Sequence, residues 1–381
     1  TDTDTDPECD GLDSDNLVIF SAADANTVCA CGITTAGQIY INATGSDPVD
    51  LSCLVSIEDT LEIENANAIS IDLSNVSGIG DDLNIHNNDT LESVDLSGLT
   101  SIGGYVQIQS NSDLSSVNLS GLLIVDEYFN VTSNSSLESV TLSNFTEVGE
   151  HFNFNSNSNL ETIEMPDLTD VGSGFYVNSN SNLETIQLPS FVDLGNELNI
   201  ESNYALEEIS MPMLEETGGN FYIQRHDSLQ SIDASSLHTI AGQLYLYENY
   251  DLETADFSAL NEVGSSLNVQ YNYALDTIDF SNLNEVNGSV EFYNNDDLSL
   301  IDLPSLTDVG SSFYIYGNDS IASLSAPLLS SLGSSLTIQD NGDLTDVDLS
   351  TLTCVSDFTI EGNNLSDGDH YALLVHLSSG C

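Results

Sequence analysis

Hydrophobic and polar residues recur along residues 83–335 in a single pattern of 23 residues, which is repeated eleven times without insertion or deletion. In the first copy, Leu83 to Tyr105, positions 1, 3, 9, 12, 14, 17 and 20 are apolar, position 6 is asparagine and position 21 is glycine. Self-similarity at a fixed period of about 20 to 50 residues is typical of solenoids, whose stacked repeats bury a continuous core. The pattern therefore predicts a solenoid in which each repeat forms one turn.

Within each turn, the pattern predicts extended segments rather than helices. Positions 1 and 3, such as Leu83 and Ile85, alternate with polar residues, which indicates a strand with one buried face. The later apolar positions are spaced by 3, 2, 3 and 3 residues, and five of the seven prolines occupy position 15, where a central strand is disfavoured. We expect an all-β fold, a right-handed parallel β-helix of about 14 turns with a roughly triangular cross-section and short helical caps at both ends.

Asparagine at position 6 is the most regular polar feature of the repeat, and His226 is the one exception in the run. Because an unpaired buried amide costs about 1–3 kcal/mol, we interpret these residues as an inward ladder whose amides bond each other and the turn backbone. Glycine at position 21, as at Gly103 and Gly149, is interpreted as a turn that needs a positive φ. The predicted ladder comprises Asn111, Asn157, Asn180, Asn203, Asn249, Asn272, Asn295 and Asn341, with Asn88, Asn134, Asn318 and Asn363 at the same position.

The two ends of the chain depart from the repeat and predict caps. Ser21 and Asp24 have the spacing of a capping box before a two-turn helix. Near the C-terminus, Ser366 or Asp367 can cap a short helix whose leucines close the open end of the core, namely Leu373, Leu374 and Leu377. The predicted organisation is a flexible acidic tail at 1–8, a disulfide-stapled cap with the first turn at 9–60, solenoid repeats at 61–357 and a C-terminal cap at 358–381.

Cys9, the strand LVIF, the helix SAADANTVC, the turn and strand AGQIYI and repeats such as LNIHNNDTLESVDLSGLTSIGG follow one another along the chain. This arrangement resembles the receptor L-domain family and its relatives among fungal glycosylphosphatidylinositol-anchored cell-wall proteins, from Cys9 to Cys381. The resemblance implies a right-handed solenoid capped by a helix and disulfides, displayed outside the cell for ligand binding or cell-wall integrity. The many turns, the strict period and the lack of a following cysteine-rich module, transmembrane span or hydrophobic anchor tail disfavour a signalling receptor.

All six cysteines lie outside the strict repeats, which predicts disulfides at both ends in an oxidising compartment. The two C-terminal cysteines form the most direct pair, whereas the other four allow three pairings. A zinc site at Cys29 and Cys31 is disfavoured, because their spacing is short and no histidine is nearby in the sequence. The favoured pairs are Cys354–Cys381, Cys9–Cys31 and Cys29–Cys53.

The charge of the chain is extreme, with 62 acidic residues against a single base, Arg225. Nucleic acid and anionic membranes are excluded as partners, because both need a basic surface. The acidity favours solubility and salt tolerance, and the alternative is bridging of acidic surfaces by Ca²⁺, which prefers oxygen ligands. No calcium loop is present, so we predict no specific metal site and no cofactor.

Glycosylation sequons and the absence of membrane signals favour a secreted, processed protein. No stretch approaches the ~20 apolar residues that a membrane span needs, and residues 1–20 lack the features of a targeting segment. Ten Asn-X-Ser/Thr sequons occur, of which Asn88, Asn134 and Asn318 lie on the predicted ladder, where a sugar would mean that the ladder faces outward. The candidate glycosylation sites are Asn42, Asn75, Asn118, Asn130, Asn144, Asn287 and Asn364.

Tyrosine is concentrated on the outward positions of the predicted strand. Eleven of the fifteen tyrosines fall at positions 2, 4, 5 or 7, all from Tyr176 onward. Stacked tyrosines can simply stabilise a solvent-facing sheet, but they also offer contact area and a hydrogen-bonding tip for a sugar or a protein. Arg225 is expected to pair with Glu201 or Glu248, or to bind an acidic group of a partner. The predicted binding face is Tyr176, Tyr222, Tyr245, Tyr247, Tyr271, Tyr293, Tyr314, Tyr316 and Arg225.

The sequence shows no catalytic constellation. The six histidines have no metal-ligand spacing, and no phosphate loop or nucleophile elbow is present, so we predict that the protein is not an enzyme. We expect an extracellular structural or adhesive glycoprotein, a rigid solenoid that assembles with copies of itself or with the cell-surface matrix. The alternative is an ectodomain that binds a glycan or a protein through the tyrosine face, and a polysaccharide-active enzyme is the least favoured hypothesis.

Overall fold

The computed structural model of the protein describes residues 9, 11–353, 355 and 357–378. The predicted acidic tail at 1–8 and the predicted Cys354–Cys381 disulfide lie outside the described residues. The chain forms two compact units, Thr1–Leu188 (unit 1) and Pro189–Cys381 (unit 2). Both units consist of parallel β-solenoid turns with 23-residue spacing, and the chain has about 15 turns where about 14 were predicted.

In unit 1, each regular turn contributes strands at three places in the repeat, and each strand pairs in parallel with its counterpart one turn away. The first strands are β1 (Asn16–Ile19), β3 (Gln38–Ile41), β6 (Leu61–Glu64), β9 (Leu83–His86), β12 (Val106–Gln109), β15 (Phe129–Thr132), β18 (Phe152–Asn155) and β21 (Phe175–Asn178). The second strands are β4 (Val49–Asp50), β7 (Ser70–Asp72), β10 (Ser93–Asp95), β13 (Ser116–Asn118), β16 (Ser139–Thr141), β19 (Thr162–Glu164) and β22 (Thr185–Gln187). The third strands are β2 (Thr35–Ala36), β5 (Ser56–Ile57), β8 (Gly78–Ile79), β11 (Ser101–Ile102), β14 (Ile124–Val125), β17 (Glu147–Val148) and β20 (Asp170–Val171).

Unit 2 repeats the same plan. Its first strands are β24 (Leu198–Glu201), β27 (Phe221–His226), β30 (Leu244–Asn249), β33 (Leu267–Gln270), β36 (Val290–Tyr293), β39 (Phe313–Tyr316), β42 (Leu336–Gln339) and β44 (Phe358–Glu361). The second strands are β25 (Glu208–Ser210), β28 (Ser231–Asp233), β31 (Thr254–Asp256), β34 (Thr277–Asp279), β37 (Leu300–Asp302), β40 (Ser323–Ser325) and β43 (Asp346–Asp348). The third strands are β23 (Asp193–Leu194), β26 (Glu216–Thr217), β29 (Thr239–Ile240), β32 (Glu262–Val263), β35 (Glu285–Val286), β38 (Asp308–Val309) and β41 (Ser331–Leu332).

The core of each unit is built from the apolar positions of the repeat, stacked on themselves. Because the register links equivalent positions, identical side chains meet inside the solenoid. In unit 1, the ring of Phe152 lies 5.6 Å from that of Phe129 and 4.9 Å from that of Phe175, all three side chains being fully buried. The side chains between them in each strand are half-exposed, which confirms the predicted alternation.

The asparagines at position 6 form the predicted inward ladder. The backbone N–H of Asn111 donates to Oδ1 of Asn134 at 3.1 Å, and its Nδ2 donates to the Ile85 carbonyl at 2.9 Å and to the same Oδ1 at 2.9 Å. In unit 2, Asn272 repeats this pattern with Asn295. Asn88, Asn134 and Asn318 are fully buried, so these three sequons are inaccessible to a glycan in the folded protein.

Glycine at position 21 does not have the positive φ that we predicted. The described glycines with positive φ are Gly32, Gly317 and Gly362, whereas Gly103 and Gly149 are absent from the left-handed region. A Cβ atom on Gly103 would clash with the Gly80 carbonyl oxygen one turn away, and one on Gly149 would clash with that of Asp126. The glycine therefore allows a close approach between turns. The left-handed residue of the repeat lies at position 5.

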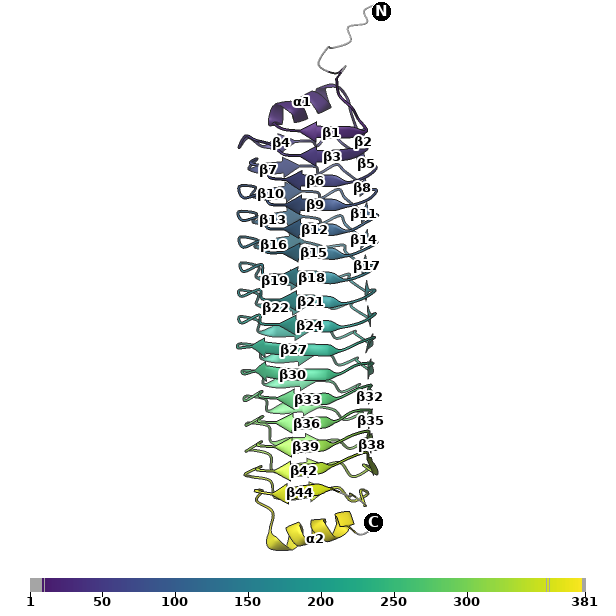
Figure 1. Ribbon diagram of the computed structural model, residues 1–381, viewed down its shortest axis with the longest axis vertical. Helices are drawn as coiled ribbons and strands as arrows, with labels where there is room; N and C mark the ends of the chain where they lie inside the picture. Colours follow the sequence, from purple (N-terminus) through teal and green to yellow (C-terminus); the bar gives the residue numbers. More distant parts are fainter. Residues whose placement is uncertain (1–8, 10, 354, 356, 379–381) are drawn as a thin grey trace, which may run out of the picture. The chain divides into compact units, whose positions relative to one another are not determined.

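Helix α1 (Ala22–Ala30) caps the first strands of unit 1, next to β1 (Figure 1). The predicted capping box is present, because the Asp24 backbone N–H donates to Ser21 Oγ and Asp24 Oδ2 accepts from the Phe20 backbone N–H. Disulfides join Cys9 to Cys31 and Cys29 to Cys53, which is the pairing that we favoured.

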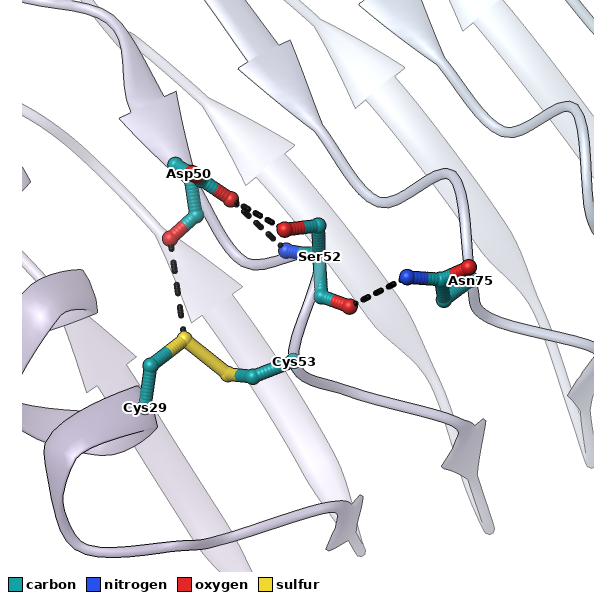
Figure 2. Close-up of a disulfide and its surroundings, with 5 residues drawn as sticks. All are labelled: Cys29, Asp50, Ser52, Cys53 and Asn75. Carbon is teal, nitrogen blue, oxygen red and sulfur yellow. Dashed lines mark hydrogen bonds between the residues drawn. A yellow bond between two sulfur atoms is a disulfide. The ribbon is translucent and has the colours of Figure 1, made fainter.

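The Cys29–Cys53 disulfide ties the end of α1 to the turn that follows β4 (Figure 2). In that turn, Asp50 Oδ1 accepts from the Ser52 backbone N–H at 3.0 Å and from its hydroxyl at 2.6 Å. These bonds stabilise the carboxylate, so the Ser52 hydroxyl and then the backbone bond lower the pKa of Asp50. Asn75, from the next turn, donates its amide to the Ser52 carbonyl at 2.7 Å.

Helix α2 (Asp367–Ser378) follows β44 and caps the end of unit 2 (Figure 1). Its N-terminus is capped by Ser366, whose Oγ accepts from the Asp369 backbone N–H at 3.2 Å. Of the three leucines predicted to close the core, Leu377 is fully buried, while the other two are half-exposed. The described part of the chain contains no helix with the length and apolar character that crossing a membrane requires.

Candidate binding face: the tyrosine cluster of unit 2

Eight tyrosines of unit 2 form an unbroken series of ring contacts, which we call the tyrosine cluster. They extend over the first strands β27, β30, β36 and β39 and over the turns that follow β30 and β33. They occupy positions 2, 4, 5 and 7 of the repeat, which are the positions that point away from the core. The members are Tyr222, Tyr245, Tyr247, Tyr250, Tyr271, Tyr273, Tyr293 and Tyr316.

Stacked and edge-to-face contacts alternate along the cluster. Tyr247 stacks on Tyr245 with ring centroids 5.1 Å apart, and Tyr293 stacks on Tyr316 at the same distance. Tyr271 stands between these pairs, almost perpendicular to Tyr247 at 85° and to Tyr293 at 78°. Both geometries are favourable for aromatic rings, so the cluster is a preorganised surface of ring faces, ring edges and hydroxyl groups.

Position 5 of the repeat gives the cluster its most unusual feature. Three consecutive turns place large residues there in the left-handed region: Arg225 with φ 61°, Glu248 with φ 55° and Tyr271 with φ 57°. The other described turns with positive φ at this position use Asn, Ser, Asp or Gly. A residue with a Cβ atom in this region costs roughly 1–2 kcal/mol, and such strain concentrates at functional sites. These three residues lie in the first three of the five turns that the tyrosine cluster spans.

Arg225 bridges two carboxylates of the neighbouring turns. Its Nη1 lies 2.5 Å from Glu201 Oε1 and its Nε lies 3.6 Å from Glu248 Oε2, so it contacts both of its predicted partners. Glu201 is the main reason why the pKa of Arg225 is raised. Because the guanidinium is half-exposed, each ion pair contributes only about 0–1 kcal/mol. The arginine is therefore largely neutralised within the protein.

Acidic side chains on the tyrosine-bearing strands are partly paired. Of the sixteen residues at positions 2 and 4 of the first strands of unit 2, three are acidic, a share close to that of the whole chain, in which 62 of 381 residues are acidic. One of the three, Glu201, pairs with Arg225, and another, Glu291, accepts from Gln270 at 3.0 Å. Burial raises the pKa of Glu291. Two of the three acidic side chains on these positions are thus engaged by neighbouring groups.

The pKa values of several tyrosines in the cluster are raised, which keeps those hydroxyl groups neutral. A hydrogen bond with Tyr293 raises the pKa of Tyr271 to about 12. Desolvation is the main cause of the raised pKa of Tyr222 and of Tyr245, and the negative charge of Asp340 is the main cause for Tyr316. These groups can therefore both donate and accept hydrogen bonds.

Two residues of the predicted binding face lie outside the cluster. Tyr176 belongs to unit 1, where its ring meets that of His151 edge-on at 6.4 Å. Tyr314 takes no part in the described ring contacts, and its hydroxyl lies 3.2 Å from Ser335 Oγ. The other predicted tyrosines and Arg225 are brought together, and Tyr250 and Tyr273 extend the cluster through a stacked pair at 5.5 Å.

A second aromatic column, in unit 1, was missed by the sequence analysis. Tyr105 stacks on Tyr128 at 4.5 Å, and Tyr128 stacks on His151 at 5.0 Å, with interplanar angles of 7° in both pairs. Desolvation raises the pKa of Tyr128 to about 12. All three occupy position 23, just before a first strand, so recurrence at one repeat position was the signal that could have revealed the column.

The candidate glycosylation sites differ in accessibility. Asn42, Asn118 and Asn130 are half-buried, and Oδ1 of Asn130 accepts from the Asn153 amide at 2.9 Å. The remaining four asparagines are exposed to solvent and are therefore the favoured glycosylation sites: Asn75, Asn144, Asn287 and Asn364. Glycosylation of these residues stays a prediction.

One group of three side chains in the described residues has a geometry suited to a metal ion. Glu62, Glu64 and His86 place ligand atoms within 4.8 Å of one another. The sequence analysis predicted no metal site, because it compared spacings along the chain rather than between neighbouring turns.

Comparisons with known proteins identify the repeat. The chain matches the family model for the BspA type leucine rich repeat region, in six copies, over residues 82–202 and 197–322. The comparison with curated proteins gives no match. Similar solved structures are the crystal structure of a TLR13–ssRNA13 complex (16% identity, TM-score 0.21, covering 87% of this chain and 63% of that one) and the Toll–Spatzle complex of Drosophila (11% identity, TM-score 0.17, covering 93% and 65%).

The chain spans less than two thirds of the length of both matched chains. At these TM-scores, the similarity to the two structures indicates nothing about its function. The family match is different in kind, because it extends over residues 82–322 and follows the strict repeat. Since this match covers more than half of the sequence, the protein belongs to the BspA type leucine rich repeat family.

Proposed function

We propose that the protein is an extracellular adhesive module that binds a glycan through the tyrosine cluster. The observation that carries the proposal is the coincidence of two features on β27, β30 and the following turns. Eight tyrosines are in contact across five consecutive turns, and the first three of those turns hold large residues at position 5 in the left-handed conformation. Other described turns place the smaller residues Ser, Asn, Asp or Gly in this conformation, so the long side chains at position 5 are particular to the tyrosine cluster.

The chemistry of the cluster favours a polyhydroxylated ligand. Aromatic faces pack against the apolar faces of sugar rings, while tyrosine hydroxyls and the neighbouring amides of Gln224 and Gln270 can bond sugar hydroxyls. Neighbouring strands of a sheet are about 4.8 Å apart, so similar groups recur at short, regular intervals along the face. A surface with this repetition suits a polymer of repeating units, which supports a polysaccharide over an isolated small molecule.

An extracellular location is supported by the chemistry of the N-terminal end. Two disulfides within residues 9–53 are typical of an oxidising compartment, and four sequons are exposed. The resemblance to fungal anchored cell-wall proteins agrees with a surface role. We therefore propose display at the cell surface, where the face would bind matrix or wall polysaccharide.

Self-assembly, which we also predicted, has less support than ligand binding. Helix α1 contacts β1 in unit 1, and α2 follows β44 in unit 2, so neither terminal first strand offers a free route to end-to-end sheet pairing. Assembly side by side would bring acidic surfaces together and needs screening by salt or cations. It stays a prediction.

An array of neutral and acidic polysaccharides tests the proposed function. We expect the wild type to capture at least one polysaccharide, and Tyr245→Ala combined with Tyr293→Ala to weaken that capture by roughly tenfold or more. Tyr204→Ala is the matched control, because Tyr204 is 50% exposed in unit 2 but takes no part in the described ring contacts of the cluster. Equal capture by the double variant would refute the assignment. Binding of a basic protein panel but of no polysaccharide would assign the face to a protein partner instead.

A further inference from the structure

Strands β6 and β9 of unit 1 bring two carboxylates and an imidazole together on the outer face. Glu62 and Glu64 occupy positions 2 and 4 of β6, and Glu64 lies opposite His86 of β9 in the parallel register. His86 Nε2 is 3.4 Å from Glu62 Oε1, and His86 Nδ1 is 4.0 Å from Glu64 Oε1. In the described first strands, β6 is the one strand that carries acidic residues at both outward positions.

The three side chains are held by neighbouring groups. Tyr40, one turn earlier, donates its hydroxyl to Glu64 Oε2 at 3.1 Å, and Asn42 donates its amide to the Tyr40 hydroxyl at 3.1 Å. This leaves Glu64 Oε1 directed at His86. The Asn87 amide lies 3.0 Å from His86 Nδ1 and fixes the ring. The side chains are partly buried, with 25% of His86, 31% of Glu62 and 29% of Glu64 exposed.

We propose that Glu62, Glu64 and His86 bind a zinc ion on the outer face of unit 1. In zinc sites the metal lies about 2.0–2.2 Å from its nitrogen and oxygen ligands, so two ligands at the tetrahedral angle are about 3.3–3.5 Å apart. The 3.4 Å between His86 Nε2 and Glu62 Oε1 meets this requirement. The three residues place one ligand atom each within 4.8 Å of one another. Glu64 Oε1 faces His86 Nδ1 at 4.0 Å, so a rotation of the Glu64 side chain is needed to bring it to a zinc ion on Nε2.

The donor set selects the class of metal. Imidazole suits zinc and other first-row transition metals, whereas Ca²⁺ and Mg²⁺ prefer sites made of oxygen alone. When zinc bonds Nε2, the neutral ring carries its proton on Nδ1. Rotation of the Asn87 amide then presents Oδ1 to that proton, which is the type of outer interaction that orients histidine ligands.

A hollow of about 310 Å³ is lined by two of the three ligands, Glu62 and His86, and by Asn84, Tyr105 and Gln107, among others. Apart from the two ligands, its walls are amide and phenol groups, so no ammonium or guanidinium lines the hollow to compete with the metal. A three-ligand zinc site keeps a fourth position for water or a ligand group. The site is separate from the proposed glycan function, because it belongs to unit 1 and the tyrosine cluster to unit 2.

Calorimetric titration of the full chain with Zn²⁺ tests the proposal. About 5 mM Ca²⁺ in the buffer occupies the general acidic surface, which binds hard cations through oxygen. We expect one zinc ion per chain. His86→Ala, and separately Glu62→Gln with Glu64→Gln, should weaken binding by roughly tenfold or more. All three side chains are partly exposed, so the variants should fold, which circular dichroism checks.

Two control variants separate the site from the acidity of the molecule. His238→Ala removes an exposed histidine elsewhere, and Glu147→Gln with Glu150→Gln removes two exposed carboxylates from unit 1. Both should bind zinc like the wild type. X-ray absorption of the zinc-loaded protein should show one imidazole, which His86→Ala removes. No saturable binding by the wild type, or an equal loss in the controls, would overturn the proposal.

Discussion

Asn249 Oδ1 has no hydrogen-bond partner among the described residues, because His226 occupies the preceding rung of the asparagine ladder. Elsewhere, as between Asn249 and Asn272, each rung donates its backbone N–H and its Nδ2 to the Oδ1 of the next. Toward the preceding turn, His226 makes contacts like those of an asparagine of the ladder. Its Nε2 lies 3.1 Å from the Ile200 carbonyl, and Nδ1 accepts from the Asn203 backbone N–H at 3.3 Å. The His226 ring therefore bonds the preceding turn, whereas Asn249 Oδ1 in the following turn has no donor.

Replacing His226 with asparagine should therefore stabilise unit 2. The new amide can donate to Asn249 Oδ1 and still reach the Ile200 carbonyl, so a buried unsatisfied oxygen gains its partner. We expect a gain of about 1 kcal/mol in the free energy of unfolding at neutral pH. Urea denaturation followed by circular dichroism measures the shift of the midpoint. A lower midpoint for His226→Asn than for the wild type would show that ring packing matters more than the missing bond.

The stability of the wild type should fall in acid partly through His226. Complete burial lowers the pKa of this residue to about 4, below its ordinary value of 6.5, while hydrogen bonds with the backbone of Asn203 and Ile200 and, less strongly, the charge of Asp227 oppose the shift. Between pH 6.5 and 4, the unfolded state binds a proton that the folded state excludes, so stability is lost as the pH falls through this window. The full contribution is on the order of 3 kcal/mol. Denaturation midpoints of the wild type and His226→Asn should diverge from pH 7 to pH 4, and parallel pH profiles would contradict this assignment.

The rungs of the ladder should be far less tolerant than the outward residues of the same strands. Asn111→Ala leaves the backbone N–H and Nδ2 of Asn88 without their acceptor and the Ile85 carbonyl without its donor, all in a buried place. We expect a loss of roughly 3 kcal/mol or more. Gln107→Ala, on the outer face of the preceding strand, is the control and should change stability little. Comparable midpoints for the two variants would argue against the ladder as a main stabilising feature.

The repeat made much of this fold predictable. The alternation at positions 1 and 3 identified the buried face of the strand. The asparagine at position 6 recurs in nearly every repeat, whereas exposed positions vary between repeats, so it was predicted to lie inside with a hydrogen-bond partner. The N-terminal helix cap could be predicted from the sequence because Ser21 and Asp24, which form it, lie within one helical turn of each other. Features that depend on neighbouring residues or on the repeat itself were thus accessible from the sequence.

Contacts between turns were harder to foresee. We predicted a positive φ for Gly103 because this is the commonest reason for a glycine that recurs in a turn. In the structure, Gly103 instead allows the backbone of the neighbouring turn to approach closely. The site formed by Glu64 and His86 was missed because its residues meet across a turn rather than along one. Similarly, Tyr176 shares a repeat position with Tyr222, and only the ring contacts show which tyrosines belong together.

Relieving the strain at position 5 should stabilise the fold at the expense of the proposed function. Glu248 has φ 55°, and asparagine, which tolerates the left-handed region, occupies the same position at Asn87 and Asn294. We expect Glu248→Asn to gain about 0.5–1 kcal/mol, because the Arg225 contact at 3.6 Å that it loses is a weak surface pair.

Removing a negative charge from so acidic a chain is itself stabilising, so Glu253→Asn serves as the charge-matched control in the same turn, at an exposed position outside the cluster. The gain in denaturation midpoint should be larger for Glu248→Asn than for Glu253→Asn. Polysaccharide capture should fall for the former alone, because Arg225 then loses one of its two anchors beside the tyrosines. If the two variants gain equally and both retain full capture, the left-handed residues of these three turns are incidental to binding.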